Sequence, residues 1–234
     1  MDLYQEEENK TAMIAAAEVE HEFYCQLTRL QETKEFAKKI GAKRIGIAFC
    51  GGVKEEAKIV TKYFRHHGFT IYKRAQVLGM LTRTSKGLCA AGTHGKTTTS
   101  SMAAHLLYQS HVGCDAFLGG ISKNYGTNLL LSDKSEYVVI EADEFDRSFH
   151  WLTPYATIIT STDADHLDIY GTEEAYLESF SHYTSLIQPG GALIMRKGIS
   201  LKPRLQEGVK LYTYSREEGD FHAANVRIGG GEII

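Results

Sequence analysis

The sequence lacks the features of a disulfide-stabilised, fibrous or membrane-embedded protein. None of its 4 cysteines is spaced as C-x-x-C, and no cysteine–histidine spacing is typical of a structural zinc site. No apolar run approaches the ~20 residues that a membrane-spanning helix needs. The acidic N-terminus MDLYQEEENK also lacks the basic-then-apolar pattern of a signal peptide. These absences predict a cytoplasmic protein with reduced, mostly buried thiols at Cys25, Cys50, Cys89 and Cys114.

Charge and composition exclude further classes. The formal net charge of -3 provides no basic field for binding nucleic acid. Apolar residues make up 43% and charged residues 24%, which is close to the average for globular proteins and excludes a disordered tail. At ~150 residues per domain, the 234 residues predict one or two domains.

The residue pattern of the first part of the chain, residues 1–72, predicts a βαβ unit preceded by helices. An Ala- and Glu-rich stretch over 11–24 favours a helix. The pattern Thr28-x-x-Gln31 is typical of a capping box that opens a second helix. The apolar run RIGIAFC, a glycine turn, a helix that ends at Gly68, and a strand over 69–72 follow in order.

The remaining chain, residues 73–234, continues the alternation of helix and strand. Helices are predicted over 73–83, 98–109 and 173–187, and strands over 86–92, 137–143, 155–161 and 192–195. This order predicts an α/β fold with a mostly parallel, P-loop-type sheet flanked by helices. Ligands of such sheets bind at the carboxyl ends of the strands, where three motifs fall.

The first motif is AGTHGKTTTSS, at residues 91–101. Glycines let backbone N–H groups approach phosphate oxygens, and the following helix N-terminus and Lys96 add positive charge. The Thr97 hydroxyl is then placed to bind Mg²⁺. Ala90 occupies the first glycine position of the full phosphate-loop pattern, and the alternative is a tight turn that merely contains a lysine. The predicted cofactor-binding residues are Gly92, Thr93, His94, Gly95, Lys96, Thr97 and Thr98.

The second motif, IEADEFDRSF, places Glu141, Asp143, Glu144 and Asp146 at the end of an apolar strand. These carboxylates repel one another unless a cation such as Mg²⁺ offsets them. The alternative is a solvated acidic loop.

The third motif is STDADHLDIYG, at residues 161–171. A histidine beside an aspartate can bind a metal through one ring nitrogen while the carboxylate orients the other, which makes His166 a candidate metal ligand. The alternative is a histidine whose hydrogen bonds are satisfied within a turn.

The segments GTHGKTTT, FLGGISKNYGTN, EADEFDRSF and TSTDADHLDIYG together resemble the ATP-binding central domain of the Mur ligases, over about residues 73–231. The stretch DADHLDIYG is most similar to the alanine-adding members, which join L-alanine to UDP-N-acetylmuramate in peptidoglycan synthesis. The resemblance implies that ATP phosphorylates a substrate carboxylate, and that an amine then displaces phosphate from the acyl phosphate.

The resemblance also implies roles for single residues. Lys96 and the loop amides would hold the β- and γ-phosphates. Thr97 and Glu141 would bind one Mg²⁺ and His166 a second, so Lys96, Glu141 and His166 are the expected catalytic residues. Asn128 would lie near the sugar-nucleotide substrate. Ser161 stands where many members carry asparagine, which leaves open what replaces the contact of that amide.

Other family features are absent. Residues 1–72 contain no G-x-G-x-x-G motif for a UDP-binding domain, and the family's C-terminal ligase domain is expected to be lacking as well. Residues 1–72 instead resemble part of an uncharacterised prokaryotic family, described as metal-binding, whose later cysteine cluster is missing here. A natural fusion, a gene-model error and a designed chimera are all compatible with this junction.

The expected function is therefore Mg-ATP binding by a ligase central domain with little or no turnover. The alternative is a nucleotide-binding or chimeric protein without ligase activity. Exposed strand edges in residues 1–72 favour self-association.

Overall fold

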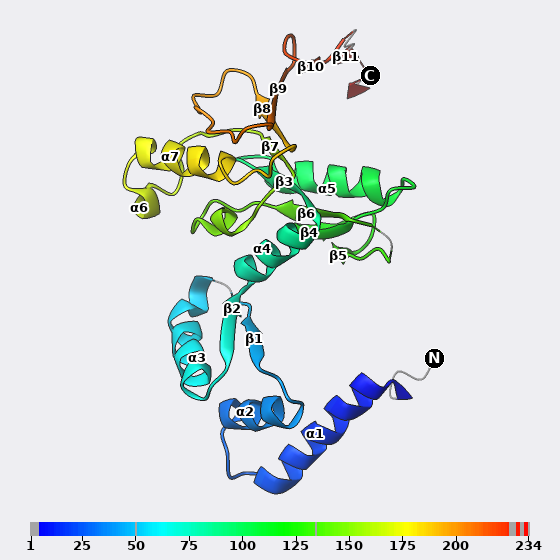
Figure 1. Ribbon diagram of the computed structural model, residues 1–234, viewed down its shortest axis with the longest axis vertical. Helices are drawn as coiled ribbons and strands as arrows, with labels where there is room; N and C mark the ends of the chain where they lie inside the picture. The colour runs from blue at the N-terminus through cyan, green and yellow to red at the C-terminus, as the bar shows by residue number, and fades with distance from the viewer. Residues whose placement is uncertain (1–4, 50, 134, 225–227, 230–231, 234) are drawn as a thin grey trace. The chain divides into compact units, whose positions relative to one another are not determined.

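The computed structural model describes residues 5–49, 51–133, 135–224, 228–229 and 232–233. The chain divides into two compact units, Met1–Val77 and Leu78–Ile234, which are considered separately (Figure 1).

The first unit is a βαβ arrangement preceded by two helices. Its strands β1 and β2 pair in parallel, and Phe64, Phe69 and Ile71 form part of its small core. The capping box is present, because the Thr28 side chain accepts a hydrogen bond from the Gln31 amide and the Gln31 side chain accepts one from the Thr28 amide. In chain order the elements are α1 (Glu7–Phe23), α2 (Arg29–Lys39), β1 (Arg44–Ile47), a 3-10 turn η2 (Gly51–Val53), α3 (Lys54–His66) and β2 (Thr70–Lys73).

Helix α4 (Arg74–Thr84) leads into the second unit, which alternates strands and helices. Its further elements are β3 (Lys86–Ala91), α5 (Lys96–Tyr108), β4 (Asp115–Ser122), β5 (Thr127–Leu130), β6 (Tyr137–Glu141), a 3-10 turn η3 (Ser148–Trp151), β7 (Ala156–Ile159), α6 (Leu167–Tyr170), α7 (Glu173–Thr184), β8 (Ala192–Arg196), β9 (Lys210–Ser215), β10 (Phe221–His222), β11 (Ile228–Gly229) and β12 (Glu232–Ile233).

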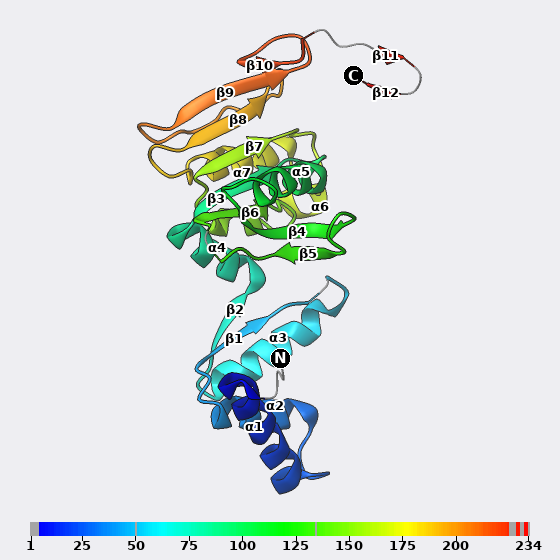
Figure 2. The same cartoon turned by 90° about the vertical axis from the view of Figure 1, so that its right-hand side faces the viewer.

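The second unit is organised around one sheet whose strand order is β10-β9-β8-β7-β3-β6-β4-β5 (Figure 2). The pair β4–β5 is antiparallel and the other pairs of this sheet are parallel. The α/β class with a mostly parallel sheet is confirmed. Strands β4, β5, β9 and β10 are additions that the sequence patterns did not predict.

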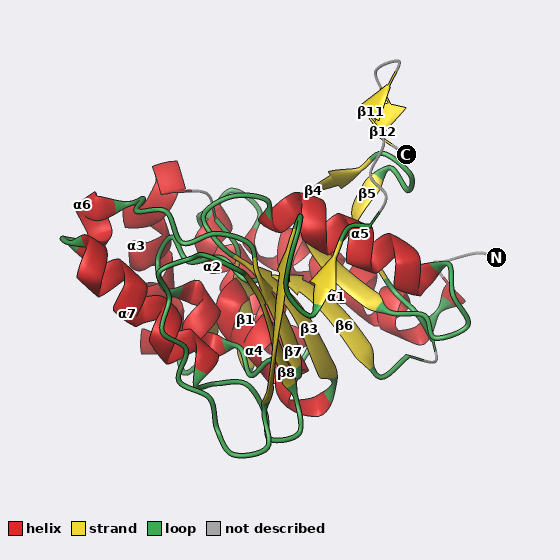
Figure 3. Ribbon diagram, turned by 90° about the horizontal axis from the view of Figure 1, so that it is seen from above, coloured by secondary structure: helices red, strands yellow, loops and turns green. Residues whose placement is uncertain are grey.

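Helices cover both faces of this sheet, as Figures 1 and 3 show for α5 on one side and α7 on the other. On the α7 face, Tyr176, Phe180 and Tyr183 pack against Val138 and Ile140 of β6. The intervening residue, Val139, instead joins the cluster on the α5 face, since successive side chains of a strand point to opposite faces. The central strands are therefore buried on both sides, as parallel strands usually are.

The described cysteine thiols differ in how deeply they are buried. Burial raises the pKa of Cys89 to about 12 and that of Cys114 to about 11, whereas Cys25 is exposed. Cys50 lies outside the described residues. Among the described residues, no helix is both long enough and apolar enough to cross a membrane.

Gly79 in α4 provides a test of this packing. Alanine is the better helix former by about 1 kcal/mol, yet a Cβ at Gly79 would lie 2.3 Å from the backbone oxygen of Trp151. We expect Gly79→Ala to lower the thermal unfolding temperature despite its helix propensity. Gly120→Ala is the control, because its Cβ would meet only Thr97 Cγ2, at 3.4 Å. Equal unfolding temperatures for the two variants would contradict the close contact.

Candidate functional site

The phosphate-loop motif forms the turn between β3 and α5. Gly92 and Gly95 have φ angles of 128° and 84°, which glycine adopts without strain, and α5 begins at Lys96. A side chain at Gly92 would also collide with Thr160 Oγ1, 2.3 Å from the position of a Cβ. The loop and Glu141 form an open cavity of about 340 Å³, lined by Thr93, His94, Gly95, Lys96, Thr97, Thr98 and Glu141.

The segment that follows β7 braces this loop. Ser161 Oγ accepts a hydrogen bond from the His94 amide at 2.9 Å, and the Ser161 carbonyl accepts one from the Thr93 amide at 3.2 Å. The Thr160 hydroxyl donates to the His94 carbonyl. Ser161 thus contacts the loop through its own hydroxyl.

A buried tyrosine of α7 also holds the loop. The Thr93 hydroxyl donates to the Asp163 carbonyl at 2.7 Å and lies 2.8 Å from the Tyr176 hydroxyl. Since the single proton of Thr93 is used on Asp163, Tyr176 is the donor to Thr93. Burial raises the pKa of Tyr176, which keeps this donor protonated. The sequence predicts the helix that carries Tyr176, but nothing in its pattern indicates this contact.

Lys96 lies between the loop and a buried carboxylate. Its Nζ donates to the Gly92 carbonyl at 3.0 Å and to Glu144 Oε1 at 2.9 Å, and Oε2 of Glu144 lies 2.9 Å from the same nitrogen. Burial raises the pKa of Glu144, and the hydrogen bond and charge of Lys96 oppose that rise. Glu144 therefore pairs with the loop lysine and does not join Glu141 in an acidic cluster.

Glu141 and Thr97 form the second polar contact of the cavity. The Thr97 hydroxyl donates to Glu141 Oε1 at 3.0 Å, and the Gly119 amide of β4 donates to Oε2 at 3.0 Å. A Cβ at Gly119 would lie 2.3 Å from Oε2, so only glycine leaves room for the carboxylate there. The glycine pair in FLGGIS is the sequence signal for this close approach.

The other acidic residues of the second motif bind within their own turn. Asp143 Oδ1 accepts a hydrogen bond from the Phe145 amide at 3.2 Å, and Asp146 Oδ1 accepts one from the Ser148 amide at 3.1 Å. In the described part of the chain, no three His, Cys, Asp or Glu side chains are grouped so that they could hold a metal ion.

His166 precedes α6 in a left-handed conformation, with φ 53°. Its amide donates to Asp165 Oδ1 at 2.7 Å, its Nε2 lies 3.6 Å from Asp165 Oδ2, and its ring packs edge-on against Phe145. The neighbouring carboxylate is the one expected from the sequence, and the metal role of His166 stays a prediction. Asn128 is exposed on β5, and its substrate role likewise stays a prediction.

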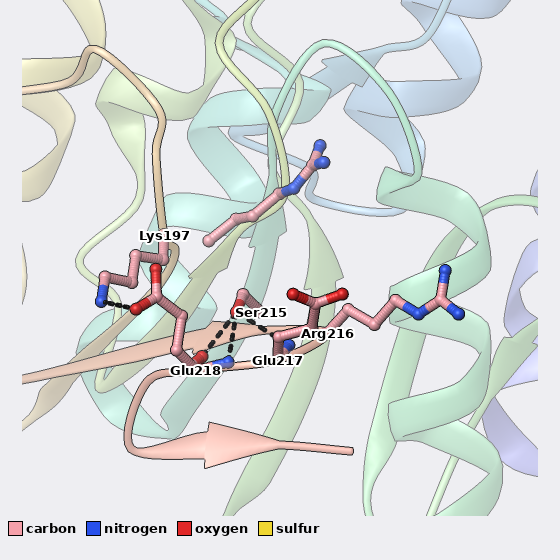
Figure 4. Close-up of a pocket in the computed structure, with 6 residues that line it drawn as sticks. Lys197, Ser215, Arg216, Glu217 and Glu218 are labelled. Carbon is pink, nitrogen blue, oxygen red and sulfur yellow. Dashed lines mark hydrogen bonds and ion pairs between the residues drawn. The ribbon is translucent and has the colours of Figure 1, made fainter. Parts of the chain in front are cut away.

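A second hollow, of about 520 Å³, lies at the ends of β8 and β9 and is lined by Arg196, Lys197, Ser215, Arg216, Glu217 and Glu218. Lys197 forms an ion pair with Glu218 at 2.7 Å, and the Ser215 hydroxyl is occupied by the turn that follows β9. In Figure 4 the Arg216 side chain extends away from both. The charges of this hollow therefore partly neutralise one another and do not converge on one point.

A glycine turn between a buried parallel strand and a helix, with a lysine and a threonine at the helix start, defines a P-loop-type α/β domain. The chain belongs to the Mur ligase middle domain family, whose model matches residues 90–232. A second family model, described as "Protein of unknown function (DUF1847)", matches residues 1–110. The family predicted from the motifs is thus confirmed.

Curated relatives are named UDP-N-acetylmuramate–L-alanine ligase. One from Phocaeicola vulgatus is 81% identical over 172 residues, and one from Porphyromonas gingivalis is 59% identical over 174 residues. Both alignments cover 74% of this chain, which spans about 38% of the length of either relative.

Solved structures agree with the fold. UDP-N-acetylmuramate-alanine ligase from Thermotoga maritima matches with a TM-score of 0.57 and 25% identity, covering 75% of this chain and 39% of that one. A UDP-N-acetylmuramate:L-alanyl-gamma-D-glutamyl-meso-diaminopimelate ligase from Neisseria meningitides matches with a TM-score of 0.63 and 21% identity, covering 80% and 62%.

Removal of the Ser161 hydroxyl tests the brace of the loop. Ser161→Ala removes the acceptor of the His94 amide, and an ordinary hydrogen bond of this kind contributes about 0.5–1.5 kcal/mol net. We expect a fall of this order in the free energy of unfolding, measured by urea titration. Ser185→Ala is the control, since the Ser185 hydroxyl donates only to the carbonyl of His182 in the same helix turn and is not part of the site. Equal decreases in the free energy of unfolding of the two variants would show that the Ser161 contact with the loop stabilises the protein no more than an ordinary surface hydrogen bond.

Proposed function

We propose that this chain binds Mg-ATP in the cavity between the glycine turn and α5, as the nucleotide-binding part of an acid–amino-acid ligase. The observation that carries the proposal is the convergence of Lys96, Thr97 and the loop on one cavity together with Glu141. The start of α5 adds unpaired N–H groups and a partial positive charge, which favour phosphate.

The polar contacts of the cavity suit Mg²⁺. This ion is usually held by one or two protein oxygens, several waters and the substrate phosphates. The Thr97 hydroxyl and the Glu141 carboxylate, already 3.0 Å apart, are such a pair. Bound Mg²⁺ would neutralise charge on the phosphates, and His166 is the proposed ligand of a second ion.

Within this proposal the residues of the chain act by positioning. The loop amides and Lys96 orient the phosphates, while Ser161 and Tyr176 fix the loop that carries those amides. The named relatives suggest the reaction class, in which the carboxylate of UDP-N-acetylmuramate is phosphorylated and the amine of L-alanine then displaces phosphate. Such a reaction would belong to peptidoglycan precursor synthesis in the cytoplasm.

A nucleotide-binding protein without ligase activity is the second candidate. The match of residues 1–110 to a different family favours it, because residues 1–89 lie outside the match to the ligase family model. The two candidates share the nucleotide site and differ in turnover.

Lys96→Ala tests nucleotide binding. Loss of the ammonium removes charge-assisted hydrogen bonds worth about 1.5–3 kcal/mol each, so we expect at least about tenfold weaker Mg-ATP binding by calorimetry. Lys210→Ala is the matched control. Lys210 is exposed at the start of β9, so it lies at the amino ends of the parallel strands, whereas the site lies at their carboxyl ends. Equal affinities of wild type and Lys96→Ala would refute the proposed site.

The same variants separate the two candidate functions. Phosphate release from ATP that requires both UDP-N-acetylmuramate and L-alanine, and that is lost in Lys96→Ala, would support ligation. Mg-ATP binding without such turnover would support the nucleotide-binding alternative.

Gly119→Ala tests the Mg²⁺ pair. The new Cβ would displace the Glu141 carboxylate from its place beside Thr97, and disturbing a metal ligand in this way costs about tenfold or more in metal affinity. We expect the Mg²⁺ concentration needed for half-maximal ATP binding to rise accordingly. Gly46→Ala in β1 is the control, because nothing lies within 4 Å of a Cβ there and β1 is not part of the site, so this variant should leave that concentration unchanged. Identical Mg²⁺ dependence in the two variants would argue against Glu141 as a ligand.

A further inference from the structure

Glu144 is a fully buried carboxylate that the proposed function does not use. Its side chain is 1% exposed, and its backbone carbonyl accepts a hydrogen bond from the Tyr170 hydroxyl. Oε1 accepts a hydrogen bond from Lys96, whereas Oε2 accepts none from the described residues although it lies 2.9 Å from Nζ. A carboxylate stays ionised in a protein interior when an opposite charge is fixed beside it.

The pairing determines what Lys96 can offer to a ligand. An ammonium group has three N–H donors. In the structure donors are directed to the Gly92 carbonyl and to Glu144, and the Lys96 side chain is only 16% exposed. The positive charge that lines the cavity is therefore already largely balanced by a negative one behind it.

Phosphate oxygens that enter the cavity must share this ammonium with Glu144. The carboxylate and the phosphates carry the same sign of charge and compete for the N–H donors of one ammonium group. Glu144 thus holds Lys96 in a defined place and lowers the affinity of the cavity for an anion by occupying N–H donors of Lys96.

We infer that Glu144 is a positioning residue for Lys96, which holds the ammonium beside the phosphate loop and competes with the nucleotide phosphates for it. The inference rests on the proposed Mg-ATP site and adds a residue that acts on it through Lys96.

Glu144→Gln tests the inference, because glutamine keeps the size and one acceptor oxygen but removes the charge. We expect Mg-ATP to bind about tenfold more tightly to Glu144→Gln than to wild type, measured by calorimetry on the full chain. In a Lys96→Ala background the same substitution should leave the dissociation constant unchanged within about twofold, since the effect passes through the ammonium. Glu136→Gln is the charge-matched control, because Glu136 is exposed and pairs with Lys86 at the start of β3.

Glu144→Asp guards against a variant that does not fold. It keeps the charge but shortens the side chain, so the ion pair is weakened and a smaller, Lys96-dependent gain in affinity is expected. Thermal unfolding of each variant shows whether it is folded. A residue with a merely structural role would lower the unfolding temperature without any Lys96-dependent change in affinity.

Several outcomes would overturn the inference. Binding that is unchanged or weaker in Glu144→Gln excludes competition, and tightening that persists without Lys96 shows that Glu144 does not act through it. If wild type binds Mg-ATP and Glu144→Gln binds equally well, the inference fails and the proposed function stands. If neither protein binds Mg-ATP, the proposed function fails and the inference fails with it.

Discussion

The close approach of the phosphate loop to the end of β7 is the constraint on which the site depends. Gly92 leaves no space for a side chain, because the Thr160 hydroxyl occupies the position where a Cβ would lie. This approach lets the backbone of Thr160 and Ser161 and the hydroxyl of Ser161 bind the loop directly. Since β3 pairs with both β6 and β7 in parallel register, the same geometry brings the ends of all three strands to one edge of the sheet.

Charge at this edge is distributed in pairs. Lys96 is matched by Glu144 beneath the loop, and Glu141 is held by a hydroxyl and a backbone amide from two other elements. Each contact restrains its side chain in the absence of ligand, so little ordering remains to oppose binding. Pre-ordering of this kind is what a site needs when its chemistry depends on the position of phosphate groups.

The sequence predicts the parts of this site that depend on local pattern. The glycine–lysine turn, the carboxylate at the end of β6 and the histidine after β7 follow from residue types placed at strand ends. Strand β4 was not predicted, because the glycine pair in DAFLGGIS interrupts the apolar alternation that marks a strand, and its contact with Glu141 was missed with it. Glu144 was grouped with its acidic neighbours because spacing along the chain does not show that its side chain folds back beneath Lys96.

The hydroxyl of Tyr176 has a consequence for the dynamics of the loop. Glycine-rich loops ordinarily open at low energy, independently of the core. Here the loop is joined through Thr93 to a fully buried side chain of α7, which packs in the largest apolar cluster of the described residues. Opening of the loop would leave that buried hydroxyl without its partner, which adds to the cost of breaking the hydrogen bonds of the Thr93 and His94 amides with Ser161. This contact thus couples the phosphate loop to the packing of α7 against the sheet.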